Sequence, residues 1–322
     1  MTLTAPPKVP VDGAPGVPVA SKRRRRTAAS GPASRTLISV VDLRRHRTLY
    51  FVVLGLTLLV FTLVFLFPLY WMVSGAVKSP AEFARSTPTL IPESFHPGTY
   101  VTAWNNMQIA KYFTNTVFYA FGGWIISLLV DVGVAYALSK LKPIFGKIVL
   151  GGMLASLMLP PTALLVPAYL TVADLPLVHI NLLNTPWALW LPAAANAFNV
   201  YVLKRFFDQI PNDLLDAAAI DGAGKLRQLW SIVLPLSRPV LGVVSIFIIV
   251  ALWKDFLWPL VVLQDPDNQT LSVALARLAN TSQVPPTEFM AGLAIASLPM
   301  IVVFLIFQRS IIGGLGSGSL KG

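Results

Sequence analysis

Long apolar stretches alternate with polar connections along most of this 322-residue chain. Three of the stretches, residues 48–77, 148–173 and 289–308, contain no charged side chain. A helix of about 20 apolar residues crosses the hydrocarbon core of a bilayer, and irregular backbone cannot face lipid. The pattern therefore predicts an all-α membrane protein with six transmembrane helices. Their approximate bounds are residues 49–71, 113–138, 148–172, 187–203, 240–263 and 289–312.

The third apolar stretch differs from the others because it contains Pro160, Pro161 and Pro167. Proline removes a backbone hydrogen bond and clashes with the preceding helical turn. We therefore predict that this helix is kinked or broken near Pro160. The carbonyl groups that the break frees must then face protein or a water-filled path.

Composition agrees with a membrane location and narrows the possible chemistry. Hydrophobic residues make up 55% of the chain and charged residues 12%, whereas soluble domains carry about 25% charged residues. Cysteine is absent, which excludes disulfides, thiolate metal sites and a cysteine nucleophile. The three histidines lack the spacing of metal ligands. We therefore expect neither a metal nor another cofactor.

The net charge of +11 is distributed unevenly between the two sides of the predicted membrane domain. Twenty Lys and Arg residues, ten of them in the first 47 residues, lie on the side that holds both termini, against 4 on the opposite side. An excess of Lys and Arg marks the cytoplasmic side, so both termini are predicted to be cytoplasmic. Because no basic face with interleaved aromatic residues is present, a nucleic-acid partner is not expected.

Two regions follow from these patterns. Residues 1–46 are rich in Pro, Ala, Ser and Arg and cannot bury enough apolar surface to offset chain entropy. They are predicted to be a disordered basic cytoplasmic tail. Residues 47–322 are predicted to form a single transmembrane domain in the cell membrane.

The cytoplasmic connection between the fourth and fifth spans, residues 204–238, has the pattern of two short helices. Asn212 is suited to cap the first helix and Gly222 to end it. The second helix begins at Lys225 and ends at Pro235. It carries one apolar stripe at helical spacing, made of Leu226, Leu229, Trp230 and Val233. From these residues alone, the pair is either a rigid knob projecting into the cytoplasm or an ordinary interfacial helix pair.

The spacing within this connection resembles a family signature. Asp216-Ala217-Ala218, Gly222 and Ile232-Val233-Leu234-Pro235 match the EAA signature of ABC importer permeases, E-A-A-x3-G-x9-I-x-L-P. The one departure is Asp216, where the family usually has Glu, so the charge is kept and the reach is about one methylene shorter.

Two further segments are similar to the sugar-transporting members of that family. The segment Asp255-Phe256-Leu257-Trp258-Pro259-Leu260 looks like the sugar-permease sequence N-[DE]-F-L-W-P-L, and Lys254 stands where Asn is usual. The ending, from Gln308-Arg309 to Lys321-Gly322, resembles that of the maltose-type family. The chain thus resembles a sugar ABC importer permease over about residues 48–322.

The resemblance implies a permease subunit that has no catalytic activity of its own. A separate ATPase dimer would dock on the EAA loop, a second homologous permease would form the other half of the path, and an extracytoplasmic binding protein would deliver a sugar. The residues expected to couple to the ATPase are Asp216, Ala217, Ala218, Gly222, Ile232, Leu234 and Pro235. The segment Gly222–Lys225 lacks the spacing of a phosphate loop, so ATP is expected on the partner.

Three charged residues lie inside the predicted spans: Asp131, Lys254 and Asp255. Intramembrane charges usually face a cavity or a partner. Lys254, Asp255 and Trp258 are therefore candidates for the solute path, and a structural ion pair is the alternative. At ~1.5 Å per residue, Asp131 and Lys254 lie roughly 12 and 21 Å from the cytoplasmic ends of their helices, which disfavours a pair between them.

Other functions fit the sequence less well. The EAA signature is shared by importers of other solutes, so a non-sugar importer is the first alternative. An ion-coupled carrier would need inverted repeats, and six spans with one large cytoplasmic knob do not offer them. A membrane enzyme would need clustered acids or histidines at one face of the membrane, and the sequence lacks such a cluster.

Overall fold

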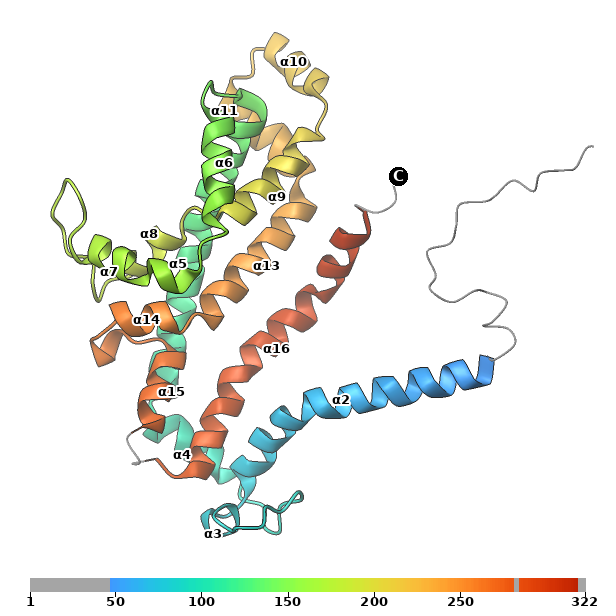
Figure 1. The fold of residues 1–322 in the computed structure, drawn as a ribbon, viewed down its shortest axis with the longest axis vertical. Helices are drawn as coiled ribbons and strands as arrows, with labels where there is room; N and C mark the ends of the chain where they lie inside the picture. Colours follow the sequence, from blue (N-terminus) through green and yellow to red (C-terminus); the bar gives the residue numbers. More distant parts are fainter. Residues whose placement is uncertain (1–46, 281–283, 318–322) are drawn as a thin grey trace, which may run out of the picture. The chain divides into compact units, whose positions relative to one another are not determined.

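The structure, a computed structural model, describes residues 47–280 and 284–317, with side chains described up to residue 307. Backbone contacts divide the chain into two units, residues 1–61 and 62–322, which we describe separately. The predicted disordered tail, residues 1–46, lies outside the described residues, as does the end of the C-terminal segment, residues 318–322. Figure 1 shows the described helices.

The first unit contains the beginning of helix α2 (Arg47–Val77), which continues into the second unit. Large apolar side chains cover this part of the helix and are exposed all around it. A helix that is apolar on every face is suited to lipid or to other membrane helices. The first predicted span therefore corresponds to a helix, although it starts earlier and ends later than predicted.

The rest of the second unit is helical. In chain order the elements are α3 (Pro80–Phe83), α4 (Gly98–Asn106), α5 (Ile109–Tyr136), π-helix η1 (Ala137–Leu141), α6 (Gly146–Ser156), 3-10 helix η2 (Pro161–Leu164), α7 (Leu165–Ala173), α8 (Trp187–Ala193), α9 (Ala197–Asp208), α10 (Asn212–Ile220), α11 (Lys225–Gln228), π-helix η3 (Leu229–Val233), α12 (Leu234–Leu236), α13 (Arg238–Lys254), α14 (Leu257–Val262), 3-10 helix η4 (Pro266–Asn268), α15 (Leu271–Ala279) and α16 (Pro286–Ser317). Among the described residues there is no strand, and one isolated bridge joins Leu175 and Ile180.

Within residues 47–280 and 284–317, three helices are long and apolar enough to cross a bilayer: Arg47–Val77, Ile109–Leu141 and Pro286–Phe307. Two bent pairs, Gly146–Ser156 with Pro161–Ala173 and Lys225–Leu236 with Arg238–Lys254, raise this number to five if each counts as one span. The all-α membrane class is confirmed at this level.

The predicted break in the third apolar stretch is confirmed. The helix axes of α6 and η2–α7 differ by 106°, and the turn falls at residues 157–160, so that Pro160 ends the turn and Pro161 begins η2. The predicted fourth span is also divided, because α8 ends at Ala193 and α9 begins at Ala197. The side chain of Asn196 caps α9 by accepting hydrogen bonds from the backbone N–H groups of Phe198 and Asn199.

Helix α5 is the central element of the second unit, and α9 and α13 pack along it. The helices approach closely at Gly122 and Gly123. A Cβ atom at Gly122 would lie 2.3 Å from the ring of Trp190, and the indole N–H of Trp190 donates to the carbonyl oxygen of Tyr119 at 2.9 Å. The absence of a side chain at Gly122 thus allows α8 to lie against α5.

Asp131 is a structural residue of this core. It is fully buried, and its carboxylate accepts hydrogen bonds from the backbone N–H of Asn196 at 2.9 Å and the side-chain amide of Asn199 at 3.1 Å. The carboxylate therefore ties α5 to the start of α9. It does not pair with Lys254, in agreement with the different depths estimated from the sequence.

Candidate functional site

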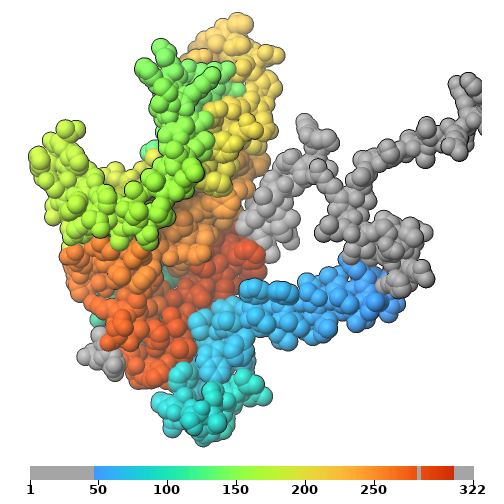
Figure 2. All heavy atoms as spheres, viewed as in Figure 1, coloured from blue at the N-terminus to red at the C-terminus, as the bar shows by residue number. Residues whose placement is uncertain are grey.

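Residues 212–236, which comprise α10, α11, η3 and α12, form a helical hairpin at one end of the second unit (Figures 1 and 2). We call this segment the coupling hairpin. Its first helix was predicted to be capped by Asn212, and this detail is wrong. Pro211 occupies the cap position and makes no side-chain cap bond. The side-chain oxygen of Asn212 instead accepts a hydrogen bond from the Lys140 ammonium at 3.1 Å.

The prediction that Gly222 ends the first helix is confirmed. Gly222 has φ of 81°, in the left-handed region that glycine adopts without a steric penalty. The N–H of Ala223 donates to the carbonyl of Ala218 at 2.8 Å, and the N–H of Gly222 to that of Ala219 at 3.0 Å. These two bonds make a Schellman motif, which sets the direction in which the chain leaves α10.

Hydrogen bonds fix the coupling hairpin to the end of α5 and η1. Tyr136 donates its hydroxyl proton to the carbonyl oxygen of Lys225 at 2.9 Å. The Lys140 ammonium, which contacts Asn212, also donates to the carbonyl of Ile210, two residues before the hairpin, at 2.7 Å. Inside the hairpin, the Gln228 amide donates to the carbonyls of Leu215 and Ala223 at 3.0 and 3.1 Å. Because Gln228 is almost fully buried, these bonds join the two helices rigidly.

The apolar stripe predicted for the second helix is only half correct. Leu229 and Val233 are buried, but Leu226 is 73% and Trp230 61% exposed. The buried face is rotated toward Gln228, whose amide is held inside. In addition, the helix changes at Leu229 into π-helix η3, whose wider turn shifts the positions that share a face.

The residues that match the EAA signature fall into two groups, one exposed and one packed against the core of the second unit. Asp216, Ala217 and Pro235 are exposed and Ala218 is half-buried. Ile232 and Leu234 are half-buried and pack against the core formed by α5, α9 and α13. The exposed face also carries large apolar side chains, namely Leu214, Ile220, Leu226 and Trp230. Isolated exposed apolar residues are normal, whereas several on one short segment are typical of an interaction site.

The second candidate site is a cavity of about 580 Å³ near the break between α13 and α14. Helix α13 ends at Lys254, Asp255 is extended, and α14 begins at Leu257. Lys254, Asp255 and Trp258, the three residues predicted for the solute path, all line this cavity.

Polar and aromatic groups from other parts of the chain complete the cavity wall. They include Thr116 and Tyr119 of α5, Asn196 and Thr270. The apolar ring of Pro161, from the break in the third apolar stretch, also lines the cavity. These four polar residues could not be predicted from the sequence, because nothing in a single helix pattern shows which polar positions on different helices face one another.

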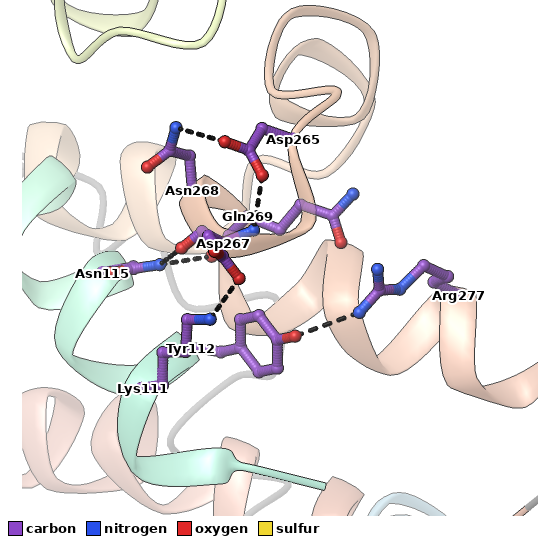
Figure 3. Close-up of polar contacts among 8 residues, drawn as sticks. All are labelled: Lys111, Tyr112, Asn115, Asp265, Asp267, Asn268, Gln269 and Arg277. Atoms are coloured by element: carbon purple, nitrogen blue, oxygen red, sulfur yellow. Dashed lines mark hydrogen bonds and ion pairs between the residues drawn. The ribbon is translucent and has the colours of Figure 1, made fainter.

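At the opposite end of α5 from the coupling hairpin, residues 264–270 are pinned by a group of polar contacts that we call the loop clamp (Figure 3). The Lys111 ammonium lies 2.5 Å from Asp267 Oδ1. The Asn115 amide donates to the carbonyls of Asp267 and Gln269 at 2.8 and 3.1 Å. The hydrogen bond from Lys111 holds the pKa of the Asp267 carboxyl below its usual range.

A second contact ties α15 to the same region of α5. The guanidinium of Arg277 donates to the hydroxyl of Tyr112 at 3.0 Å, as Figure 3 shows. Further along α5, the hydroxyl of Thr116 accepts a hydrogen bond from the backbone N–H of Leu271 at 2.8 Å. The loop after α14 and the beginning of α15 are therefore attached to α5 next to the part of the cavity wall that Thr116 and Thr270 form.

A family model and individual relatives both connect this chain with transport permeases. Residues 130–315 match the family described as "Binding-protein-dependent transport system inner membrane component". The chain is 32% identical over 271 residues to the probable ABC transporter permease protein YurM of Bacillus subtilis, covering 82% of this chain and 87% of the relative. It is 30% identical over 269 residues to the diacetylchitobiose uptake system permease protein NgcG of Streptomyces coelicolor, with the same two coverages.

The fold is similar to that of a solved transporter. A chain in the crystal structure of a bacterial ABC transporter involved in the import of the acidic polysaccharide alginate superposes with a TM-score of 0.72. The match covers 84% of this chain and 98% of the other, at 24% sequence identity. At that identity the likeness concerns the fold.

Proposed function

Because the chain belongs to the family of binding-protein-dependent transport system inner membrane components, we propose that it is the permease subunit of an ATP-driven importer of a sugar or oligosaccharide. The family is one of transport components and not of enzymes. Relatives that are named for uptake of diacetylchitobiose and of melibiose, raffinose and stachyose support a carbohydrate as the solute. The resemblance of residues 255–260 to the sugar-permease segment points to the same class.

In this proposal residues 47–322 form one membrane domain of six spans in the cell membrane. The spans are α2, α5, α6 with α7, α8 with α9, α13 with α14, and α16. Support comes from the charge count of 20 against 4, because an excess of Lys and Arg is typical of the cytoplasmic side, which in this proposal holds the coupling hairpin and both termini. Reporter fusions after Lys142 and Gly222 should read cytoplasmic, and fusions after Thr99 and Asn280 should read external. An external signal at Gly222 would contradict the permease proposal.

The observation that carries the proposal is the geometry of the coupling hairpin. It presents an exposed carboxylate, Asp216, beside exposed apolar side chains, on a segment whose direction is fixed by Gly222 and by the bond from Tyr136 to Lys225. A rigid segment of this kind can transmit a movement of a docked partner to α5. We propose that the partner is a dimeric cytoplasmic ATPase.

The remaining partners follow from the same proposal. One chain supplies one wall of a path, and a second homologous permease would supply the other. The outer segments, including the loop clamp, would receive the solute from an extracytoplasmic binding protein. The cavity lined by Lys254, Asp255 and Trp258 is then this subunit's part of the solute path.

The test is co-purification of the ATPase together with uptake of labelled oligosaccharides. Asp216→Lys reverses the charge on the exposed face and should abolish uptake and loosen the ATPase. Asp216→Glu is the matched control, since it keeps the charge and adds one methylene, and it should retain both properties. Binding of solute to the separate binding protein should be the same in all three. If Asp216→Lys keeps full uptake, the hairpin is a plain interfacial helix pair and the proposal fails.

The two alternative transport mechanisms are separated in the same vesicles. Uptake that requires ATP and resists a protonophore or sodium ionophore supports the importer. Uptake driven by an ion gradient without ATP would favour a secondary carrier. ATP-dependent uptake of a non-sugar solute would support the proposed ATP-driven mechanism but would show that the proposed solute class is wrong.

A further inference from the structure

Lys254 presents an uncompensated positive charge to the cavity. It ends α13 and lines both the 580 Å³ cavity and an adjoining one of about 520 Å³. Of the described side chains that line either cavity, Lys254 is the only cation. It makes no ion pair and no hydrogen bond with any residue that the structure describes.

Asp255 does not neutralise this charge, although it is the next residue. Its Oδ1 accepts the backbone N–H of Trp258 at 3.5 Å, at the start of α14, where the first N–H groups of a helix have no partner within the helix. A carboxylate there also complements the helix dipole. No oxygen of Asp255 lies within 4.0 Å of the Lys254 ammonium.

Most neutral polar groups in the same wall already have partners in the protein. The Tyr119 hydroxyl donates to the carbonyl of Asn268 at 2.9 Å, and the Trp258 indole N–H donates to the carbonyl of Ala188 at 2.9 Å. The Thr116 hydroxyl donates to Tyr112 and accepts from Leu271. The ring of Trp258 therefore remains as an apolar surface for a sugar. The Lys254 ammonium remains as an uncommitted charged donor, and the side-chain N–H groups of Asn196 as uncommitted neutral ones.

An ammonium inside a membrane domain is costly unless a partner or a hydrated cavity compensates it. The second cavity offers little compensation, because its wall is mostly apolar and includes Trp253, Phe256, Leu275 and Phe289. The dipole at the C-terminal end of α13 favours a cation at this position. It provides no hydrogen-bond acceptor for the three N–H groups of the Lys254 ammonium.

We infer that the solute is an acidic carbohydrate and that Lys254 binds its anionic group, a carboxylate or a sulfate. This inference rests on the proposed function of the chain as a path-forming subunit and specifies the class of solute. In the bound state the sugar ring lies against Trp258, a hydroxyl donates to the carboxylate of Asp255, and the anionic group accepts hydrogen bonds from the Lys254 ammonium. A neutral oligosaccharide would leave that ammonium without a partner.

The experiment measures ATP-dependent uptake by the complete importer, with its binding protein, of oligosaccharide pairs that differ only in the group at carbon 6. One member of each pair carries a carboxylate, as in digalacturonate and dimannuronate, and the other carries a hydroxyl, as in galactobiose and mannobiose. Galactose 6-sulfate and galactose form the sulfate arm. We expect uptake of acidic members, and the arm that is taken up identifies the anionic group.

Variants of Lys254 then test the contact. Lys254→Met keeps most of the side-chain length and removes the charge, so uptake of the acidic solute should fall by about tenfold or more, the factor for losing one hydrogen bond to a charged group. Lys254→Arg should keep most of it. Lys147→Met removes an exposed lysine at the start of α6 and should change nothing.

A chemical rescue separates the charge from any effect on folding. The chain has no cysteine, so Lys254→Cys introduces its only thiol. Reaction with aminoethyl methanethiosulfonate forms a mixed disulfide, releases methanesulfinate and restores an ammonium. Uptake of the acidic solute should return with this reagent and not with the neutral ethyl reagent. The wild-type chain, treated in the same way, reports on cysteines in the other subunits.

The outcomes distinguish the inference from the proposed function. ATP-dependent uptake of neutral members only, or an acidic solute whose uptake is unchanged in Lys254→Met, would overturn the inference and leave the importer intact. Absence of ATP-dependent uptake for every carbohydrate would count against the proposed function itself. Uptake rescued equally by the neutral and the charged reagent would show that Lys254 fills space, which also overturns the inference.

Discussion

The hydroxyl of Tyr136, in the last turn of α5, donates to the backbone carbonyl oxygen of Lys225, the first residue of α11, at 2.9 Å. This bond joins the coupling hairpin to the same helix that contributes Thr116 and Tyr119 to the cavity. Tyr136 is buried, so water does not readily replace the bond. The pair thus connects the coupling hairpin to the helix that lines the cavity, in addition to the direct continuation of the hairpin into α13, which ends at Lys254.

Tyr136→Phe should weaken this connection while keeping the ring in place. Losing one such bond costs about 0.5–1.5 kcal/mol, so folding should survive with a modest fall in thermal stability. If the bond transmits movement, uptake per ATP hydrolysed should fall by more than the amount of complex. Tyr201→Phe is the matched control, because the Tyr201 hydroxyl makes no hydrogen bond with the described residues. If uptake per ATP hydrolysed is the same in the two variants, the bond from Tyr136 does not transmit movement between the two sites.

Substitutions at Gly222 should follow backbone preference and not side-chain size. No atom lies within 4 Å of a Cβ built there, but φ is 81°. A non-glycine residue in this region costs roughly 1–2 kcal/mol, and asparagine costs less because it tolerates the left-handed region. We expect ATPase association in the order Gly222→Asn above Gly222→Ala above Gly222→Val.

Gly224 supplies the control for that series. It also has open space around its Cβ position, but its φ of −65° is ordinary for any residue. Gly224→Val should therefore retain much more ATPase association than Gly222→Val in the same pull-down assay. Equal losses would mean that bulk on the docking face, and not the direction of the chain, is responsible.

Asp131 should be needed for stability and independent of Lys254. In Asp131→Asn an amide NH2 group replaces one of the two acceptor oxygens and faces one of the two N–H donors. This should lower the free energy of unfolding by about 1–3 kcal/mol. The measurement is thermal unfolding in detergent, with membrane abundance as a second readout. In a double-mutant cycle with Lys254→Met, the two changes should add within about 0.5 kcal/mol. A larger coupling would indicate an ion pair that the structure does not contain.

The loop clamp should be insensitive to pH in the physiological range and loosen in acid. Because Lys111 holds the pKa of Asp267 below its usual range, the stability that this carboxylate contributes is fully present above its unfolded pKa of about 3.9. It is lost as the pH falls through the depressed folded value. Limited proteolysis of residues 264–280 should therefore be slow at pH 5–8 and accelerate below about pH 4.

Lys111→Met provides the comparison for the acid titration. Without the ammonium, the loop should be cleaved faster at neutral pH, and lowering the pH should add less to the rate. The clamp retains the bonds from Asn115 to the carbonyls of Asp267 and Gln269, so the loop should not unfold completely. Identical pH profiles for the variant and the wild-type chain would show that the ion pair contributes nothing.

The sequence predicted the features that depend on local chemistry. Hydrophobic runs predicted helices, the Pro160-Pro161 pair predicted the break after α6, and Gly222 predicted the end of α10. Lys254, Asp255 and Trp258 were predicted to share a site, and they line one cavity. The division of the fourth span was missed, because Asp131, 65 residues away in sequence from Asn196, supplies the acceptor that stabilises the start of α9.

Errors in the coupling hairpin have the same origin. Asn212 suits a cap, but Lys140 takes its oxygen, and the buried amide of Gln228 rotates the second helix so that Leu226 and Trp230 face outward. Each of these contacts joins residues that no short pattern relates. Periodicity identifies which residues can share a face of one helix, whereas tertiary partners decide which face is buried.

The interruption between α13 and α14 has a consequence for the resting transporter. The last carbonyl groups of α13 and the first N–H groups of α14 have no partners within their helices, and they meet at Lys254, Asp255 and Phe256. Such backbone is tolerated within a bilayer only where protein surrounds it or water reaches it. Protein compensates part of this break, because the Ser272 hydroxyl donates to the carbonyl oxygen of Asp255 at 3.3 Å and the Trp258 N–H donates to the Asp255 carboxylate. Water in the adjoining cavity compensates the groups that remain. In the proposed six-span arrangement a hydrated pocket within the path cannot itself seal the membrane, so the barrier that prevents ions from leaking must lie in a different layer, between the wetted break and one of the two aqueous phases.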